Sequence, residues 1–267
     1  MKSSSEHLLR VSRARPLLGT LVEIQAGACQ GDILNAAISR AFELIEQVHQ
    51  SMSCQSMDST LNRLNQALPG HWIELDRHCL RVLRAAEQVR RRTGGLFDPR
   101  LPAGSSEPAS PLLLEQRGLR VRKSSPEPIC LDGIAKGYAV DLAVAELKRW
   151  GVRQACVNAG GDLRVFGAAE VPVLVPDPRA PERAAALVRL CDQAMATSAS
   201  CDGQVGMMRH PAPTIWEGNW SVTVAAPSAM LADALTKVVV GSGVEQSRSL
   251  LAGFRAEAWA LELRHAA

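Results

Sequence analysis

The sequence contains few aromatic residues, little net charge and no long apolar run. Its aromatics are five Trp, four Phe and one Tyr among 267 residues, and 30 Lys and Arg face 27 Asp and Glu, a formal charge of +3. So few stacking platforms and so weak a positive balance argue against nucleic acid as a partner. No window reaches the roughly 18 apolar residues of a membrane-spanning helix, so we expect no membrane span.

The cysteines lack the pattern of a zinc site or a disulfide framework. There are seven, an odd number, and none forms a C-x-x-C pair. Scattered cysteines in a chain of this size predict buried thiols in a reducing compartment. The N-terminal segment MKSSSEHLLRVSRARP is basic but has no apolar core like that of a secretory signal. We therefore expect a cytoplasmic protein, and export stays open in case a leader is missing from the sequence.

What is present is ordinary globular composition, with 46% hydrophobic and 21% charged residues, which excludes wholesale disorder. Periodicity predicts short strands in clusters between a few long helices, a pattern that favours an α+β fold. Helices are expected over 33–52, 58–65, 76–93, 138–150 and 230–240, and strands over 18–26, 154–158, 163–166, 171–175, 193–200, 219–226 and 255–263.

The length predicts one large domain or two intimate ones, and we expect a single domain over 1–267. Three of its segments lack the patterns of helices and strands. We expect residues 1–14 to be disordered, the Pro/Ser-rich segment 99–118 to be a surface loop, and the non-periodic segment 204–218 to be a mobile loop.

Glycine-flanked turns are the first candidates for chemistry. Gly94 and Gly95 end a helix just before Phe97 and Asp98, which could contact a ligand; the alternative is a buried Phe and an Asp that opens the Asp-Pro turn. The segment 133–137 (GIAKG) opens a helix, so its backbone N–H groups could cradle phosphate beside Lys136. Its alternative is a tight turn with a solvated lysine.

Two familiar nucleotide motifs are missing. Nothing resembles G-x-x-x-x-G-K-[ST], and the segment 158–162 (NAGGD) is not G-x-G-x-x-G, so it predicts a turn between two strands and not a Rossmann site. Asp233 and Thr236 share one helix face and could hold a hard cation through oxygen ligands, or Asp233 could simply favour the first helical turn. His210 lies in the non-periodic segment, and a lone His is usually structural.

In order along the chain, these segments resemble the ApbE-type FAD:protein FMN transferase family. Each segment alone is a weak match, but eight of them occur in the family's order. They are 15–20 (RPLLGT), 52–65, 93–99 (TGGLFDP), 133–141 (GIAKGYAVD), 157–163 (VNAGGDL), 196–198 (ATS), 221–224 (SVTV) and 232–236 (ADALT).

The resemblance implies an α+β, two-lobed fold with mixed or antiparallel sheets flanked by helices and a ligand cleft between the lobes. It implies an enzyme that uses FAD as substrate and Mg²⁺ as cofactor. Such an enzyme splits FAD, attaches FMN to a Thr or Ser hydroxyl of an acceptor protein and releases AMP. Charge neutralisation at the pyrophosphate is the main catalytic demand of that reaction.

The resemblance also assigns site residues by motif match. Catalytic roles fall to Asp233, Lys136 and His210. Contacts to the flavin nucleotide fall to Phe97, Asp98, Lys136, Gly133 and Thr197. The metal ligands would be the Gly133 carbonyl, Asp233 and Thr236.

The sequence departs from the family pattern at several of its motifs. Gln55 stands where an aromatic is common, Cys130 where an Asp is usual, and Asp132 where a glycine is usual. The family's His motif survives only as 209–214 (RHPAPT). Lys237 replaces a Thr on the metal-site helix, and a lysine there could occupy the cation's position. Two hypotheses follow: a working transferase, or a catalytically weakened relative that binds a flavin nucleotide or a partner protein as a carrier or scaffold.

Overall fold

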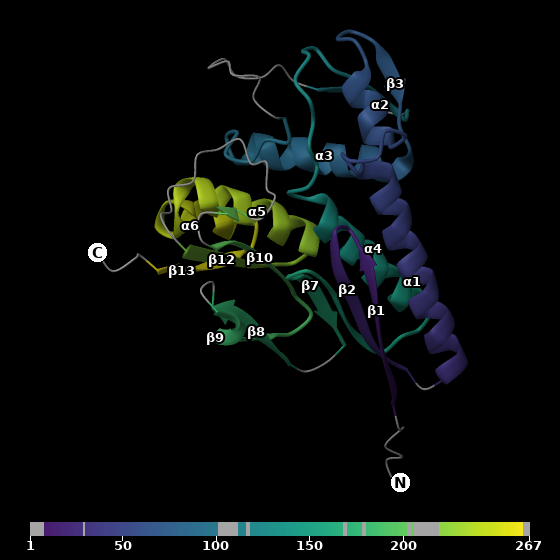
Figure 1. Ribbon diagram of the computed structural model, residues 1–267, viewed down its shortest axis with the longest axis vertical. Coiled ribbons are helices and arrows are strands. Elements are labelled where there is room, and N and C mark those ends of the chain that lie inside the picture. Colours follow the sequence, from purple (N-terminus) through teal and green to yellow (C-terminus); the bar gives the residue numbers. More distant parts are fainter. Residues whose placement is uncertain are drawn as a thin grey trace.

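The computed structural model describes residues 8–28, 30–100, 112–115, 118–167, 170–177, 180–201, 204–205 and 219–263. Its centre is an antiparallel eight-stranded sheet in the order β1-β2-β6-β7-β10-β12-β13, with β11 paired to β10 (Figure 1). The strands are β1 (Leu9–Leu17), β2 (Thr20–Ala28), β6 (Gln154–Ala159), β7 (Asp162–Phe166), β10 (Ala194–Cys201), β11 (Gln204–Val205), β12 (Asn219–Ala226) and β13 (Glu257–Leu263).

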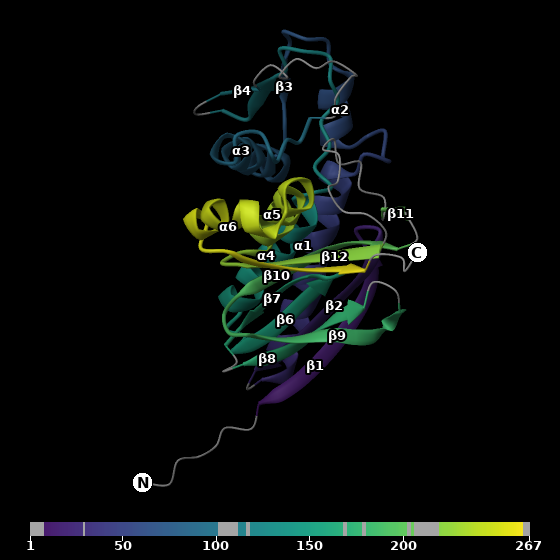
Figure 2. The same ribbon diagram turned by 90° about the vertical axis from the view of Figure 1, so that its left-hand side faces the viewer.

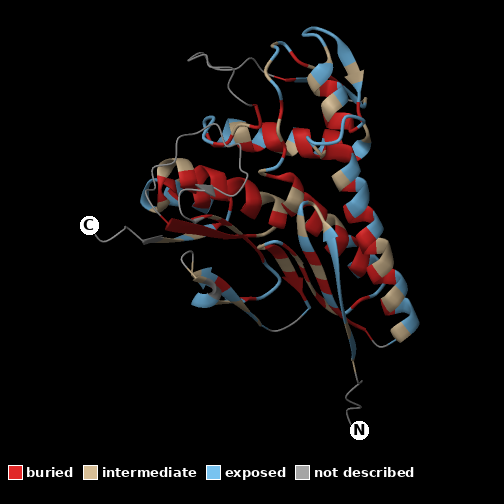
Figure 3. Ribbon diagram, in the orientation of Figure 1, coloured by how far each residue is buried: buried red, intermediate tan, exposed pale blue. Residues whose placement is uncertain are grey.

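Helices cover one face of this sheet and a hairpin lies on the other (Figure 2). Helices α1 (Gly31–Met52), α4 (Ala135–Arg149) and α5 (Ala229–Ser242) form the helical layer, and α6 (Val244–Gly253) follows α5. The hairpin of β8 (Val171–Asp177) and β9 (Ala180–Leu190) packs under β7 and β10 around a small apolar cluster that includes Val165 and Met195. Strand β12 is buried along its whole length, as Figure 3 shows.

A smaller lobe stands above the helical layer. It contains α2 (Thr60–Gln66), α3 (Arg77–Arg92) and a three-stranded sheet, β3 (Trp72–Glu74), β5 (Arg120–Arg122) and β4 (Leu113–Leu114). Leu64 of α2, Leu83 of α3 and Trp220 of β12 belong to one continuous hydrophobic core. The two lobes therefore share their interior.

Local chemistry accounts for the start of α2 and for both ends of α3. The Asp76 carboxylate accepts hydrogen bonds from the backbone N–H groups of His78 and Cys79, at 2.8 and 3.0 Å, and so caps α3 at the residue where the sequence predicts the helix to begin. Gly94 and Gly95 end this helix with φ of 62° and 87°. The helix expected over 58–65 begins later, at Thr60, and its cap is not Asp58 but Ser59, whose side chain accepts the N–H of Asn62.

Other expectations also need correction. Residues 9–14 are not disordered but lie in the edge strand β1, whereas residues 1–7 lie outside the described part. The segment 99–118 includes strand β4, and 101–111 and 116–117 lie outside the description. Residues 204–205 form β11, and the rest of the predicted mobile loop, 206–218, is likewise not described. Of the helices the structure describes, none is both long and apolar enough to cross a bilayer.

Helices α4 and α5 pack backbone against backbone at Gly137. A Cβ at this position would lie 2.2 Å from the Ala229 carbonyl oxygen, so only glycine permits the contact. Further along α4, the Asp141 carboxylate accepts the first N–H groups of α5, those of Ala229 and Met230, both at 3.0 Å. The same carboxylate accepts a 2.6 Å bond from Arg164 of β7, so Asp141 joins α4, α5 and β7.

Replacing Gly137 with alanine should force the two helices apart. We expect Gly137→Ala to lower the free energy of unfolding by about 3 kcal/mol, the upper end of overpacking costs, because the clash is with backbone. Urea denaturation measures the change. Gly31→Ala is the matched control, since its Cβ would meet only Leu9 Cδ1 at an ordinary 3.5 Å. Equal stability of the two variants would contradict the predicted role of Gly137.

Candidate functional site

A cavity of about 570 Å³ opens where the helical layer meets the sheet. This volume lies in the range of pockets that bind small molecules and cofactors. Its walls come from six places in the chain: the β1–β2 turn, the end of α1 with the turn after it, the turn into α4, the β6–β7 turn, strand β10 and helix α5. The lining residues include Leu18, Gly19, Met52, Cys54, Gln55, Asp132, Lys136, Gly160, Thr197, Ser198 and Lys237.

Two tight turns shape one side of this cavity. Leu18 and Gly19 connect β1 to β2 with φ of 57° and 71°, and Gly160 and Gly161 connect β6 to β7 with φ of 61° and 96°. Two successive positive φ values are the geometry of a two-residue hairpin turn, which glycine adopts without strain. Asn158 Oδ1 accepts the Gly161 N–H at 3.0 Å, so the predicted turn between strands at 158–162 is confirmed.

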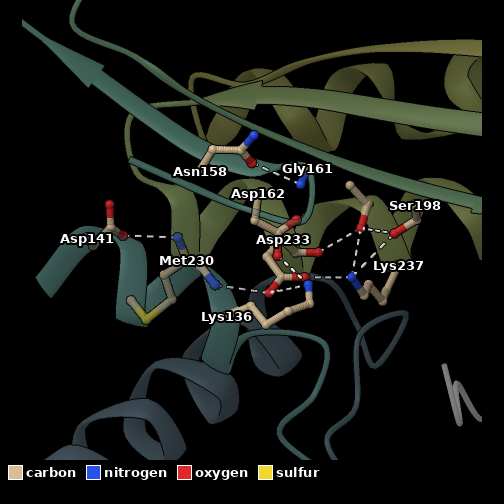
Figure 4. Close-up of polar contacts among 11 residues, drawn as sticks. Lys136, Asp141, Asn158, Gly161, Asp162, Ser198, Met230, Asp233 and Lys237 are labelled. Atoms are coloured by element: carbon tan, nitrogen blue, oxygen red, sulfur yellow. Dashed lines mark hydrogen bonds and ion pairs between the residues drawn. The ribbon is translucent and has the colours of Figure 1, made fainter. Parts of the chain in front are cut away.

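Four charged side chains meet beside the cavity (Figure 4). The Asp233 carboxylate on α5 lies between two ammonium groups. Lys237 Nζ is 2.6 Å from Oδ1, and Lys136 Nζ is 3.9 Å from Oδ2. Lys136 also makes a short hydrogen bond with Asp162, at the start of β7. We call these four residues the charge quartet.

The quartet is buried except at Lys136. Asp233 is 0%, Asp162 1% and Lys237 3% exposed, whereas the Lys136 side chain is 31% exposed and faces the cavity. When both carboxylates are ionised, they and the two ammonium groups sum to no net charge. Isolated buried charges are costly, so each group depends on its partners for staying ionised.

The pKa values follow from this arrangement. Burial alone would raise the pKa of Asp233, but the Lys136 and Lys237 ammonium groups, together with the Gly137 N–H, hold it below its usual range. Burial and the neighbouring Asp233 carboxylate raise the pKa of Asp162 to about 7. Burial opposes the charge on Lys136, yet Asp233 and Asp162 raise its pKa above the usual value.

The side-chain oxygen atoms expected to bind Mg²⁺ are already engaged. Asp233 Oδ1 accepts from Lys237, and Oδ2 accepts the Gly137 N–H at 3.2 Å. Thr236 Oγ1 donates to the Asp233 carbonyl oxygen at 2.7 Å and contacts Lys237 Nζ at 3.1 Å. Mg²⁺ demands near-octahedral oxygen ligands at about 2.0–2.1 Å, which an adjacent ammonium group excludes. The donor set of Gly133, Asp233 and Thr236 therefore does not fit Mg²⁺.

The structure does not bring Phe97 and Asp98 to the cavity wall. The Phe97 side chain is buried in the hydrophobic core. Asp98 accepts the backbone N–H of Arg100 at 3.0 Å and pairs with its guanidinium group. This geometry matches the alternative interpretation of the motif, a buried Phe and an Asp that opens a turn. Contact of either residue with a nucleotide stays a prediction.

The other predicted site residues differ in where they lie relative to the cavity. Thr197 lines the cavity, and its hydroxyl lies 3.0 Å from that of Thr223. Gly133 packs against the Lys237 stem, since a Cβ there would be 3.2 Å from Lys237 Cε. His210 lies outside the described residues, so its catalytic role stays a prediction.

Motif matching alone missed two members of the site. Asp162 is the last residue of the NAGGD segment and completes the quartet. Ser198 Oγ lies 2.8 Å from Thr236 Oγ1 and 3.4 Å from Lys237 Nζ. Both residues lie in segments that match the family, 157–163 and 196–198, but the motif match assigned neither of them a role.

Removing the Lys237 charge should leave Asp233 buried beside a single cation. We expect Lys237→Met to lower the free energy of unfolding by about 3–5 kcal/mol, as for other broken buried pairs. The double variant Asp233→Asn/Lys237→Met should recover part of this loss, because its two remaining charged residues, Lys136 and Asp162, pair with each other. Chemical denaturation measures the wild type, the two single variants Lys237→Met and Asp233→Asn, and the double variant, with the exposed Lys148→Met as control. Additive effects of the two substitutions would argue against the ion pair.

Comparisons with known proteins match this architecture. A protein named FAD:protein FMN transferase from Rhodobacter capsulatus is 27% identical over 186 residues, covering 59% of this chain and 35% of that relative, about a third of its length. The protein of the same name from Treponema pallidum is 25% identical over 91% of this chain and 82% of its own.

The fold is that of a known structure. The crystal structure of Pseudomonas stutzeri flavinyl transferase ApbE matches with a TM-score of 0.79 at 18% identity, covering 97% of this chain and 92% of that one. The predicted α+β class with antiparallel sheets and flanking helices is thereby confirmed. A model of the ApbE family matches residues 18–104 and 111–260, and the chain belongs to this family.

Proposed function

We propose that this chain is a flavin transferase that splits FAD and attaches FMN to a Thr or Ser hydroxyl of an acceptor protein, with release of AMP. The two relatives described above are named for that activity. One observation carries the proposal: Lys136 and Lys237 converge on the wall of a cavity of nucleotide size, each held by a buried carboxylate. Such a site suits an anionic diphosphate.

The proposed reaction is a substitution at phosphorus. The acceptor hydroxyl oxygen attacks the phosphorus of the FMN half, the bond from this phosphorus to the bridging oxygen breaks, and AMP leaves with that oxygen. The hydroxyl proton is released, and His210 is the residue that we propose for its transfer. Lys136 and Lys237 would stabilise the charge that develops on the phosphate oxygens. Asp233 and Asp162 would position the two lysines.

The resemblance implies Mg²⁺ for this reaction. Because Asp233 and Thr236, the side chains expected to bind that ion, do not fit it, we assign no step of the reaction to a metal. The transfer is therefore measured both with added Mg²⁺ and with EDTA.

A carrier or scaffold is the second candidate. Gln55 lies exposed at the cavity rim, where the family commonly has an aromatic that would stack on a ring. A weaker hold on the nucleotide would reduce turnover more than it reduces binding of a partner protein. The two candidate functions differ in their products: a transferase yields a flavin-labelled acceptor and AMP, and a carrier yields neither.

The test mixes the protein with FAD and a candidate acceptor domain that carries a Thr or Ser. We expect a flavin-fluorescent acceptor band after denaturing electrophoresis and an equal amount of AMP. Lys136→Met and Asp233→Asn should each slow transfer about 100- to 1,000-fold, as loss of one charge-stabilising group does in other enzymes. Lys148→Met, an exposed lysine on α4, is the control and should keep full activity.

Circular dichroism and thermal denaturation would verify that the variants fold. Binding of FAD with neither fluorescent product nor AMP, in both the Mg²⁺ and the EDTA arms, would favour the carrier. Equal transfer by wild type and Lys136→Met would contradict the role of the lysine.

A further inference from the structure

Two of the three groups expected to hold a metal ion contact the Lys237 ammonium group, and the stem of this lysine packs against the third residue, Gly133. Its Nζ lies 2.6 Å from Asp233 Oδ1 and 3.1 Å from Thr236 Oγ1. Its Cε would be 3.2 Å from a Cβ on Gly133, so the lysine stem passes directly over this glycine. The lysine therefore fills the space between the expected ligands.

The charge balance points the same way. Asp162 and Asp233 are already neutralised by Lys136 and Lys237, all within one cluster. A divalent cation on Asp233 would add two positive charges to a neutral, mostly buried site. Lys237 also has little freedom to withdraw, because it is 3% exposed and its ammonium group is hydrogen-bonded to Asp233, Thr236 and Ser198.

We propose that Lys237 is the resident cation of this site and that a nucleotide diphosphate binds beside it without a divalent ion held by Asp233. The nature of this ligand rests on the proposed function, but the exclusion of the ion does not. A covalently attached ammonium group cannot be removed by a chelator, nor can it exchange with other cations. It supplies one charge and directional N–H donors where a metal would supply two charges.

Mn²⁺ is the probe for this inference, because its electron paramagnetic resonance signal falls when the ion binds protein. Wild type should leave the signal of one equivalent of Mn²⁺ unchanged. Lys237→Thr restores the residue that the family pattern has at this place and frees Asp233 Oδ1. This variant should bind one Mn²⁺ per chain, at least about ten-fold more tightly than wild type. Lys237→Thr/Asp233→Asn should lose that site again, and Lys148→Thr should never gain it.

Two results would overturn the proposal. One is a Mn²⁺ site in the wild type that disappears in Asp233→Asn. The other is a folded Lys237→Thr variant that binds no more Mn²⁺ than wild type. If Lys237→Thr does not fold, the comparison of wild type with Asp233→Asn decides alone. These measurements do not depend on enzymatic turnover. A protein that shows no transferase activity but excludes Mn²⁺ would contradict the proposed function and still support this inference.

A second, independent observation concerns the rim of the cavity. Cys54, Cys130 and Asp132 each offer one ligand atom, and these three atoms lie within 4.8 Å of one another. The two Sγ atoms are 4.0 Å apart. Two thiolates bound to one Zn²⁺ at about 2.3 Å with a tetrahedral angle are separated by about 3.8 Å. The distance between the two Sγ atoms is thus close to that of two thiolates bound to the same ion.

The backbone fixes both cysteines from outside the cluster. The Cys54 carbonyl accepts a hydrogen bond from Asn62 Nδ2 at 3.1 Å, and the Cys130 N–H donates to the Pro99 carbonyl at 2.7 Å. Cys54 and Asp132 line the cavity, so a fourth ligand position would face it. Cys130 and Asp132 are two of the positions at which this sequence departs from the family pattern. The expectation of scattered, buried thiols is therefore wrong here, since Cys54 is exposed and adjacent to Cys130.

We infer that Cys54, Cys130 and Asp132 bind a borderline-soft divalent cation of the Zn²⁺ class. Both thiols would lose their protons to solvent on binding, and the carboxylate would supply the third ligand. Thiolates select such ions over Mg²⁺. This site is separate from Asp233 and does not rest on the proposed function.

Co²⁺ is the probe, because thiolate ligation gives it a charge-transfer absorption band. Fully reduced protein, titrated without oxygen, should develop this band at one Co²⁺ per chain, and added Zn²⁺ should remove it. Cys54→Ser and Cys130→Ser should each abolish or strongly weaken the band, whereas Cys191→Ser, an exposed cysteine elsewhere, should not. Absence of the band, or a band of full strength in Cys130→Ser, would overturn the inference.

Discussion

The site depends on one buried ion pair, Asp233 with Lys237 on a single turn of α5. A carboxylate that is 0% exposed cannot stay charged without a partner, and the lysine one turn later supplies it. The pair keeps the Asp233 carboxylate and the Lys237 ammonium group ionised beside the cavity. It also determines how Lys136 and Asp162 arrange themselves, because Asp233 lies near both lysines. The quartet is neutral when both carboxylates are ionised, and this pairing lowers the free-energy cost of burying its charges.

The glycine turns explain how such polar groups come together. Gly160 and Gly161 turn the chain sharply after β6, so that Asp162 begins β7 under the helical layer. Gly137 lets α4 approach α5 closely enough for its own N–H to reach Asp233 at 3.2 Å. The local conformations of glycine and the long-range charge pairing thus support the same geometry.

Much of the fold was predictable where the pattern was strong. The apolar stripe of α1, the Asp76 cap and the alternation of β12 all correspond to observed elements. Strand β1 was missed because it is a mostly exposed, arginine-rich edge strand, in which only Val11 and Leu17 pack against the core. The long strand β9 was missed for a similar reason. The proximity of Asp233 and Lys237 followed from their spacing on one helix, but Asp162 is distant in sequence, and only the sheet brings it to them.

Asp141 holds the N-terminus of α5, its own helix α4 and Arg164 of β7 together through one carboxylate. These three elements are the ones that carry Asp233, Lys136 and Asp162. The walls built from the β1–β2 turn and from the segment after α1 have no such common anchor among the contacts described. If the cavity adjusts to ligands of different shape, we therefore expect those two walls to move. The three elements that carry the charge quartet would move together as one rigid body.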